Sequence, residues 1–178
     1  DGTFIVTTNK GTRHHAPVIA IAGGLGSFEP RKPLLENLHK YEDNGVAYMI
    51  KDPEVYRDKK VVISGGGDSA LDWSIYLADM ASQVTLVHRR NEFRGALDSV
   101  EKVRSLKEQG KINLITPAEV IGLQGDKVLE AIVIEKSDAH ENIILEADAY
   151  IPLFGLSPKL GPIADWGLEI EKNAIKVD

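Results

Sequence analysis

A glycine-rich turn over residues 65–70 is the part of this sequence whose residue types and spacing best fit a chemical task. It has the form G-x-G-x-x-A and follows the apolar run 61–63. In this pattern the first glycine, Gly65, permits a tight turn, and the second, Gly67, lets a pyrophosphate approach the backbone. The small Ala70 lets a helix and a strand pack closely, and unpaired N–H groups at the start of that helix bind the phosphates. The turn therefore predicts a dinucleotide site.

Clustered arginines after the next apolar run predict which dinucleotide fits. In sites for NAD, an acidic residue roughly 20 positions beyond the glycines accepts hydrogen bonds from the ribose 2′-hydroxyl. Here the place 21 positions after Gly67 holds His88 and no acid. Arg89, Arg90 and Arg94 follow it. Guanidinium forks suit a phosphate dianion, so the pattern favours NADP over NAD. The alternative is an ordinary loop beside a solvated arginine patch.

Composition places the chain among ordinary globular proteins of one or two domains. It has 178 residues, of which 43% are apolar and 27% are charged. The formal net charge of −6 gives no basic field for nucleic acid, and the arginine cluster is a local exception. The absence of cysteine excludes disulfides, thiolate metal sites and a dithiol redox centre in these residues. Its histidines lie in polar stretches without ligand spacing, so no metal site is predicted.

Targeting signals are not recognisable in the sequence. No apolar run reaches the roughly 20 residues that span a bilayer, and the N-terminus lacks the pattern of a signal peptide. We therefore expect no membrane association and a cytoplasmic setting. The chain begins at Asp1 without methionine and enters a strand-like segment at once, which predicts a piece of a longer protein.

The elements that must position the turn and the arginines form a βαβ series. The glycine turn joins an expected strand to an expected helix, and Gly110 is a plausible cap for the next helix. An antiparallel meander replaces a later crossover helix, and a final strand returns to the parallel sheet. In order, we expect a strand at 61–64, a helix at 69–81, a strand at 84–87, a helix at 97–109, a strand at 112–115, meander strands at 120–123, 128–135 and 143–145, and a strand at 149–154.

The remaining segments carry weaker signals. Residues 4–8 and 18–22 read as strands, whereas 31–44 reads as an irregular surface connection and 51–60 as a linker. The tail after residue 166 has little pattern.

A second glycine-rich segment, residues 23–30, resembles a phosphate loop. Pro30 and Pro33 stand where its helix would begin, so we prefer a structural turn.

Three segments together resemble a known family. They are residues 65–70, the run His88-Arg89-Arg90-Asn91-Glu92-Phe93-Arg94, and residues 154–158. They are similar to the two-dinucleotide-domain flavoprotein reductases, and most of all to the thioredoxin-reductase-like ferredoxin:NADP reductases. The resemblance covers essentially the whole chain. It implies an α/β fold: a Rossmann-like three-layer dinucleotide-binding domain with a parallel sheet and an antiparallel β-meander crossover, flanked by pieces of an FAD domain.

The resemblance also implies a division of the chain. Residues 1–51 would be a partial FAD-domain segment and linker, 52–158 the NADP-binding domain, and 159–178 a partial return towards the FAD domain. Where thioredoxin reductases carry a C-x-x-C pair, this chain has residues 48–51, Tyr-Met-Ile-Lys, so dithiol chemistry is impossible there. The family's N-terminal FAD fingerprint and its C-terminal Gly-Asp motif have no counterpart, so the resemblance places FAD in the full-length protein.

As function, the resemblance implies hydride exchange between NADPH and flavin in a ferredoxin:NADP reductase, with electrons passed to ferredoxin or flavodoxin. The fragment by itself would be inactive and contains no catalytic residue. The resemblance also allows a homodimer. Two alternatives stay open: a non-catalytic NADP-binding module, and a thioredoxin-reductase-like flavoprotein without its redox cysteines.

The resemblance assigns roles at the cofactor site. Asp68 and Ser69 lie at the pyrophosphate, the arginines bind the 2′-phosphate, and His88 lies beside the adenosine ribose. Asp72 is either near the nicotinamide carboxamide or a solvent-facing carboxylate that the helix dipole favours. The candidate cofactor-binding residues are Gly65, Gly66, Gly67, Asp68, Ser69, Ala70, Asp72, His88, Arg89, Arg90, Arg94, Gly155 and Leu156.

Overall fold

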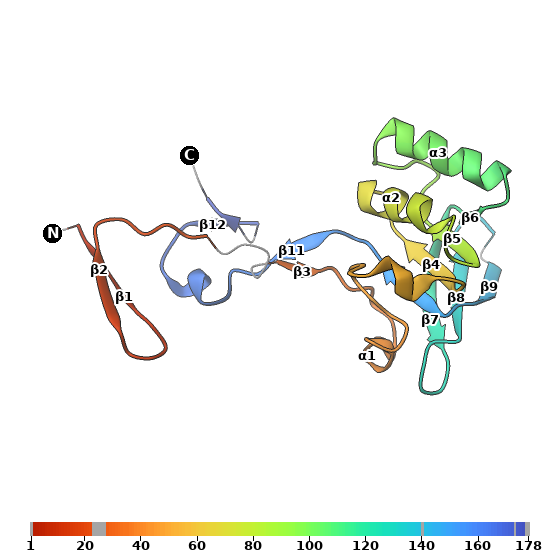
Figure 1. The fold of residues 1–178 in the computed structure, drawn as a ribbon. Coiled ribbons are helices and arrows are strands. Elements are labelled where there is room, and N and C mark those ends of the chain that lie inside the picture. Colours follow the sequence, from red (N-terminus) through yellow and green to blue (C-terminus); the bar gives the residue numbers. More distant parts are fainter. Residues whose placement is uncertain (1, 23–27, 140, 173, 177–178) are drawn as a thin grey trace. The chain divides into compact units, whose positions relative to one another are not determined.

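The computed structural model describes residues 2–22, 28–139, 141–172 and 174–176 (Figure 1). The chain divides into two compact units. One is Pro30–Leu156, and the other combines Asp1–Glu29 with Ser157–Asp178. The domain boundaries at residues 52 and 158, which the resemblance implies, stay a prediction. The two compact units are defined by contacts within the chain, and such contacts do not show where a cofactor binds. Most of the second glycine-rich segment, 23–27, lies outside the described residues.

A four-stranded parallel sheet is the centre of the larger unit. Its order is β10-β4-β5-β6, and the strands are β10 (Ala149–Pro152), β4 (Lys60–Ser64), β5 (Gln83–Val87) and β6 (Ile112–Ile115). Almost every residue of β4, β5 and β10 is buried. Because parallel strands are covered on both faces, β4, β5 and β10 are largely apolar runs, and this pattern predicted them from the sequence.

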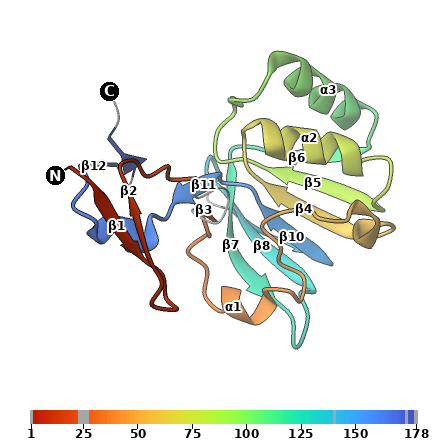
Figure 2. The same cartoon turned by 60° about the vertical axis from the view of Figure 1, so that its left-hand side comes forward.

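Two helices cover one face of this sheet, as Figures 1 and 2 show. They are α2 (Asp68–Leu77) and α3 (Leu97–Glu108). The helix predicted over 69–81 ends four residues early, because the amides of Met80 and Ala81 both turn back to the carbonyl of Leu77, at 3.0 and 2.9 Å. Gly110 follows α3 with φ +74°, which confirms it as the residue that stops the helix.

A three-stranded antiparallel sheet covers the opposite face (Figure 2). It consists of β7 (Ala118–Gln124), β8 (Ala131–Lys136) and β9 (Glu141–Glu146), and confirms the predicted meander. Two apolar clusters fill the spaces above and below the parallel sheet. The helix-side cluster includes Ile63, Leu71, Leu77, Leu86, Val103 and Ile151, and the meander-side cluster includes Val62, Val87, Ile132, Ile134 and Tyr150. The three layers match the predicted fold class.

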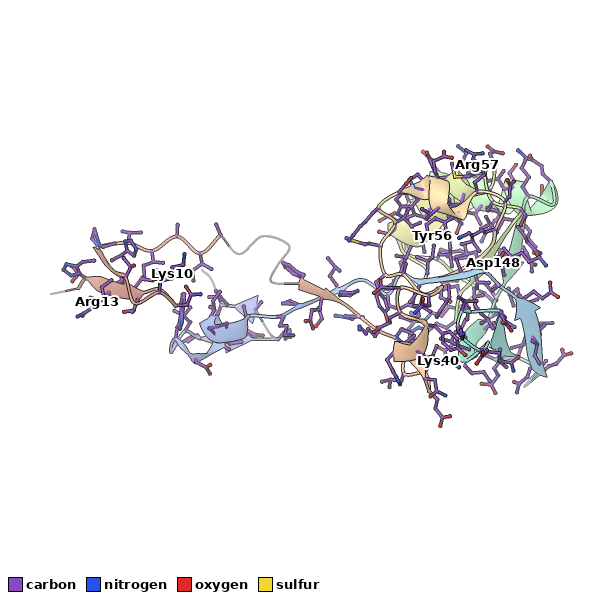
Figure 3. All side chains as sticks on the ribbon, turned by 60° about the horizontal axis from the view of Figure 1, so that its bottom comes forward. Lys10, Arg13, Lys40, Tyr56, Arg57 and Asp148 are labelled. Atoms are coloured by element: carbon purple, nitrogen blue, oxygen red, sulfur yellow. The ribbon has the colours of Figure 1, made fainter. Side chains whose placement is uncertain are left out.

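Two segments read as irregular contain buried structure. Within 31–44 lies the helical turn α1 (Leu38–Tyr41), whose first and last residues are both buried; the Tyr41 hydroxyl donates to the carbonyl of Gly125 at 2.8 Å. The expectation of a surface connection is therefore wrong for this turn. Within 51–60 a 3-10 helix, Pro53–Tyr56, buries the ring of Tyr56, which is labelled in Figure 3.

The smaller unit begins with the hairpin of β1 (Phe4–Thr7) and β2 (Arg13–Ala16). The prediction of a strand at 18–22 is wrong, since these residues are in no strand. A turn fixes the pairing: the Thr8 amide donates to Thr12 and the Gly11 amide to Thr8, both at 2.9 Å, so β2 starts at once. The unit also holds a 3-10 helix, Gly161–Asp165, and the pair β12 (Ile170–Glu171) and β13 (Ala174–Ile175).

The strands β3 (Phe28–Pro30) and β11 (Leu156–Pro158) form a two-stranded sheet of their own.

Among the described residues, no helix has the length and apolar content needed to cross a bilayer.

Candidate functional site

The glycine turn lies at the carboxyl end of β4 and leads directly into α2. Gly65 has φ +156°, and a Cβ atom there would lie 2.7 Å from the carbonyl oxygen of Leu153 and 2.8 Å from the Cβ of Ala70. Its amide donates to the carbonyl of Val87 at 3.1 Å. The turn thus brings helix α2, strand β5 and the end of β10 into close contact. Because a side chain would not fit between them, position 65 requires a glycine.

Gly67 stands in open space. No atom lies within 4 Å of the place where its Cβ would be. It precedes α2 in an extended conformation (φ −100°, ψ 179°). The first amides of a helix have no acceptor within the helix, so they can bind an anion that approaches this side of the turn. Ser69 is exposed in the same first turn. The geometry therefore leaves room for a phosphate where the sequence predicted one.

His88 fills the space against the middle glycine. A Cβ on Gly66 would lie 2.2 to 2.6 Å from three atoms of the His88 ring. His88 is 8% exposed, and its ring stacks on Phe93, with ring centroids 5.0 Å apart and an interplanar angle of 22°. Its Nε2 lies 3.1 Å from the carbonyl oxygen of Glu92, so this nitrogen carries the proton and donates. His88 is consequently packed beneath the turn.

The segment 88–96, here called the arginine loop, is attached to the turn by its backbone. The Arg94 amide donates to the Gly66 carbonyl at 2.7 Å, and the Ala96 amide donates to Oδ1 of Asp68 at 2.7 Å. The side chains of Arg89, Arg90 and Arg94 are exposed, and none has an ion pair with a described residue. The structure therefore brings together the two motifs that the sequence separated by 21 positions.

Other candidate residues lie at the edges of this arrangement. Asp72 is exposed and accepts a hydrogen bond from the Ser99 hydroxyl at 3.0 Å, which links α2 to α3. Gly155 has φ +86°, and its carbonyl accepts from the Arg31 amide at 3.0 Å. Leu156 is 50% exposed and begins β11. Both follow Leu153, the residue that touches Gly65, within three positions.

Sequence reasoning missed three residues that hold the loop: Phe93, Gly95 and Ala96. Phe93 belongs to the run 88–94 that carries the family resemblance, but the resemblance assigns it no role. In the sequence, Phe93 is recognisable only as a single aromatic residue within a polar stretch, and Gly95 only as a glycine just before a helix. Neither feature indicates which residue it contacts.

The comparisons with known proteins bear on what this arrangement is. The family model described as pyridine nucleotide-disulphide oxidoreductase matches residues 2–178. This chain belongs to that family. A ferredoxin–NADP reductase of Flavobacterium johnsoniae is 73% identical over 178 residues, which are 100% of this chain and 50% of that protein. One of Thermus thermophilus is 41% identical over 175 residues, 98% of this chain and 52% of that protein.

Solved structures of the family confirm the fold. A thioredoxin reductase of Lactococcus lactis superimposes with a TM-score of 0.85 at 26% identity, over 99% of this chain and 57% of that chain. The chain spans about half the length of the curated relatives it matches. The resemblance read from the motifs is thus confirmed.

The buried His88 makes the stability of the fold depend on pH. Burial holds its pKa below the ordinary 6.5, and the positive charges of Arg89, Arg94 and Arg90 act in the same direction against the hydrogen bond to Glu92. The unfolded chain takes up a proton near pH 6.5 while the folded chain does not. We therefore expect the free energy of unfolding to fall as the pH drops below 6.5, until the lowered folded pKa is passed.

Thermal unfolding between pH 7.5 and 5.5, followed by circular dichroism, checks this expectation. His88→Gln is the control, since its amide can still donate to the Glu92 carbonyl but does not titrate. The variant should lose less stability over this range. Parallel curves for both proteins would contradict the assignment.

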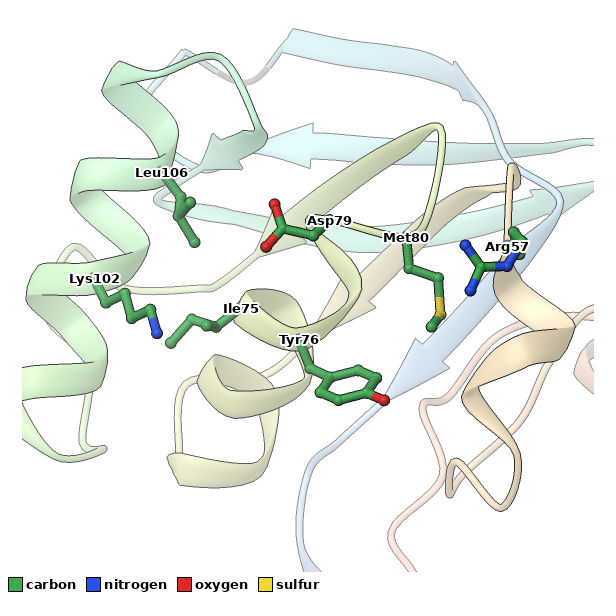
Figure 4. A pocket seen from close by; sticks show the side chains of 7 residues that line it. All are labelled: Arg57, Ile75, Tyr76, Asp79, Met80, Lys102 and Leu106. Carbon is green, nitrogen blue, oxygen red and sulfur yellow. The ribbon is translucent and has the colours of Figure 1, made fainter.

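The groove between α2 and α3 contains two shallow hollows. The larger, about 440 Å³, is lined by the seven residues of Figure 4, among them Ile75, Tyr76 and Lys102. The other, about 350 Å³, includes Asp72 and Ser99. No residue of the glycine turn or the arginine loop lines either hollow. The two hollows are therefore separate from the glycine turn and the arginine loop, and Asp72 is the candidate residue that lines the smaller one.

Proposed function

We propose that residues 52–158 are the NADP-binding portion of an FAD-dependent ferredoxin:NADP oxidoreductase. The attachment of the arginine loop to the glycine turn carries the proposal. The Arg94 amide donates to the Gly66 carbonyl at 2.7 Å. This bond holds the cationic side chains of the loop beside the turn, whose shape suits a pyrophosphate. The names of the similar ferredoxin–NADP reductases, together with their greater length, favour an enzyme over a free-standing binding module.

In this function each part of the site has a separate task. The open side of Gly67, with the first amides of α2 and Ser69, holds the pyrophosphate. Arg89, Arg90 and Arg94 bind the 2′-phosphate, because guanidinium groups donate to a phosphate in a bidentate geometry. His88 supports the loop near the ribose from beneath. Gly155 and Leu156 close over the dinucleotide in this proposal.

The flavin belongs to the full-length protein in this proposal. When both cofactors are bound, they supply hydride transfer between nicotinamide and flavin, and the electrons pass to ferredoxin or flavodoxin. The smaller unit supports its assignment to an FAD domain, since several large apolar side chains there are exposed and require a cover. These are Phe4, Ile5, Trp166 and Ile170, at 52%, 57%, 52% and 40% exposure. A cytoplasmic homodimer is part of the same proposal.

Calorimetric titration of the 178-residue chain with NADP and, separately, with NAD tests the proposal. We expect NADP to bind at least about tenfold more tightly, since one charge-assisted contact to the 2′-phosphate contributes about 1.5 kcal/mol or more. Low ionic strength keeps the exposed arginines least screened. Equal affinities would contradict NADP selectivity, and binding of neither dinucleotide would contradict the site.

A further inference from the structure

We propose that Asp68 is a positioning residue for NADP selectivity. Its carboxylate holds the arginine loop against the first turn of α2 and does not itself contact the dinucleotide. The inference rests on the proposed function and deepens it: the resemblance places Asp68 at the pyrophosphate, and the inference gives its carboxylate a separate role on which recognition of the 2′-phosphate depends.

Two hydrogen bonds donated by backbone amides fasten the loop on either side of Gly95. Oδ1 of Asp68 accepts from the Ala96 amide at 2.7 Å, across 28 positions of sequence. Two residues earlier, the Arg94 amide donates to the carbonyl of Gly66 at 2.7 Å. Ala96 immediately precedes α3 and has no capping side chain of its own. The loop is thus joined to the turn at Arg94 and to α2 at Ala96.

Close packing shows how tightly this end of the loop fits. A Cβ on Gly95 would lie 2.5 Å from Cδ1 of Leu71, 3.0 Å from Oδ1 of Asp68 and 3.1 Å from the Asp68 amide. A real Cβ atom does not come as close as 2.5 Å, so the loop backbone lies directly on the start of α2. At the other end of the loop, the stacked rings of His88 and Phe93 fix its path.

The fastening matters for the arginines because they are exposed and have no ion partner among the described residues. Side chains that are ordered only when the ligand binds lose conformational freedom at that moment, and a preorganised loop reduces this cost. Without the Asp68 bond, the segment that carries Arg94 would keep one of its two attachments. The loss would affect only a ligand that the loop recognises, which is the dinucleotide with a 2′-phosphate.

The experiment compares Asp68→Ala with Asp68→Asn in the 178-residue chain, titrated with NADP and with NAD. Asp68→Ala should weaken NADP binding about tenfold and change NAD binding less than about twofold. Asp68→Asn should keep most of the NADP affinity, because its amide oxygen still accepts from the Ala96 amide. Asp98→Ala is the control, since it removes an exposed carboxylate from the first turn of α3 and leaves the loop bonds intact.

Two further measurements separate positioning from a general loss of structure. Amide hydrogen exchange in residues 88–96 should accelerate in Asp68→Ala and stay unchanged in Asp98→Ala. Gly95→Ala, which keeps the carboxylate but forces the loop away from Leu71, should also reduce the preference for NADP. Circular dichroism shows whether each variant retains its fold.

The outcomes distinguish this inference from the function on which it rests. A wild-type chain that prefers NADP, with an unchanged preference in Asp68→Ala, would overturn the role of Asp68 alone. An equal loss of affinity for NADP and NAD in a folded Asp68→Asn would instead indicate direct contact at the pyrophosphate and would also overturn it. A wild-type chain that binds neither dinucleotide would overturn the proposed function itself.

Discussion

Replacing Arg89, Arg90 and Arg94 together by alanine is expected to weaken NADP binding about a thousandfold and to leave NAD binding nearly unchanged. Each charge-assisted hydrogen bond to a phosphate contributes about 1.5 to 3 kcal/mol, and we take the lower value because the three side chains are exposed. NAD lacks the 2′-phosphate that these residues would bind. Calorimetric titration with both dinucleotides measures the two affinities directly.

A matched control removes the same charge elsewhere. Lys102, Arg104 and Lys107 are exposed on α3, so their triple alanine variant shifts the net charge equally without touching the loop. If the effect is specific, this control should change NADP binding only slightly, and the wild-type NADP affinity should fall as salt is added. Equal losses for NADP and NAD in the loop variant, or an equal loss in the control, would refute the assignment of the arginines.

Gly65→Ala is expected to destabilise the fold by about 3 kcal/mol, whereas Gly67→Ala should cost no more than about 1 kcal/mol. The added methyl group at Gly65 meets a backbone oxygen of Leu153 at 2.7 Å, which cannot move without shifting the end of β10. A left-handed φ adds backbone strain for alanine. At Gly67 the methyl group meets no atom within 4 Å.

For dinucleotide binding we expect the opposite order, so that Gly67→Ala has the larger effect. Gly67→Ala fills the open side of the turn and should weaken NADP and NAD by a similar factor, because both carry the pyrophosphate. Urea unfolding followed by circular dichroism gives the two stabilities, and calorimetry gives the affinities. Equal destabilisation by the two substitutions, or a stable Gly67→Ala variant with normal affinity for both dinucleotides, would show that the turn does not work as described.

The agreement between sequence and structure is best where a residue's environment follows from its near neighbours. Strands β4 and β5 are continuous apolar runs because parallel strands are covered on both faces, and that pattern is visible locally. Gly110 stops α3 because its left-handed conformation suits glycine, again a local property. The glycine turn and the arginines were found by the same reasoning.

The failures have a common origin in contacts between distant residues. β2 consists of Arg13, His14, His15 and Ala16, which have no apolar pattern, and it is a strand because it pairs with β1, where Ala16 lies opposite Phe4. The burial of Tyr41 depends on Gly125, a partner 84 positions away. No local pattern contains such information, since it arises only when the chain has folded.

By itself, the sequence determined the kind of fold and the dinucleotide motifs, because glycine conformation, apolar periodicity and guanidinium chemistry are properties of short segments. Only the tertiary structure decided how these motifs meet. It placed the ring of His88 against Gly66 and the amide of Ala96 on the carboxylate of Asp68. Those contacts depend on the spacing of β4 and β5 in the sheet and on the start of α2, which no single segment encodes.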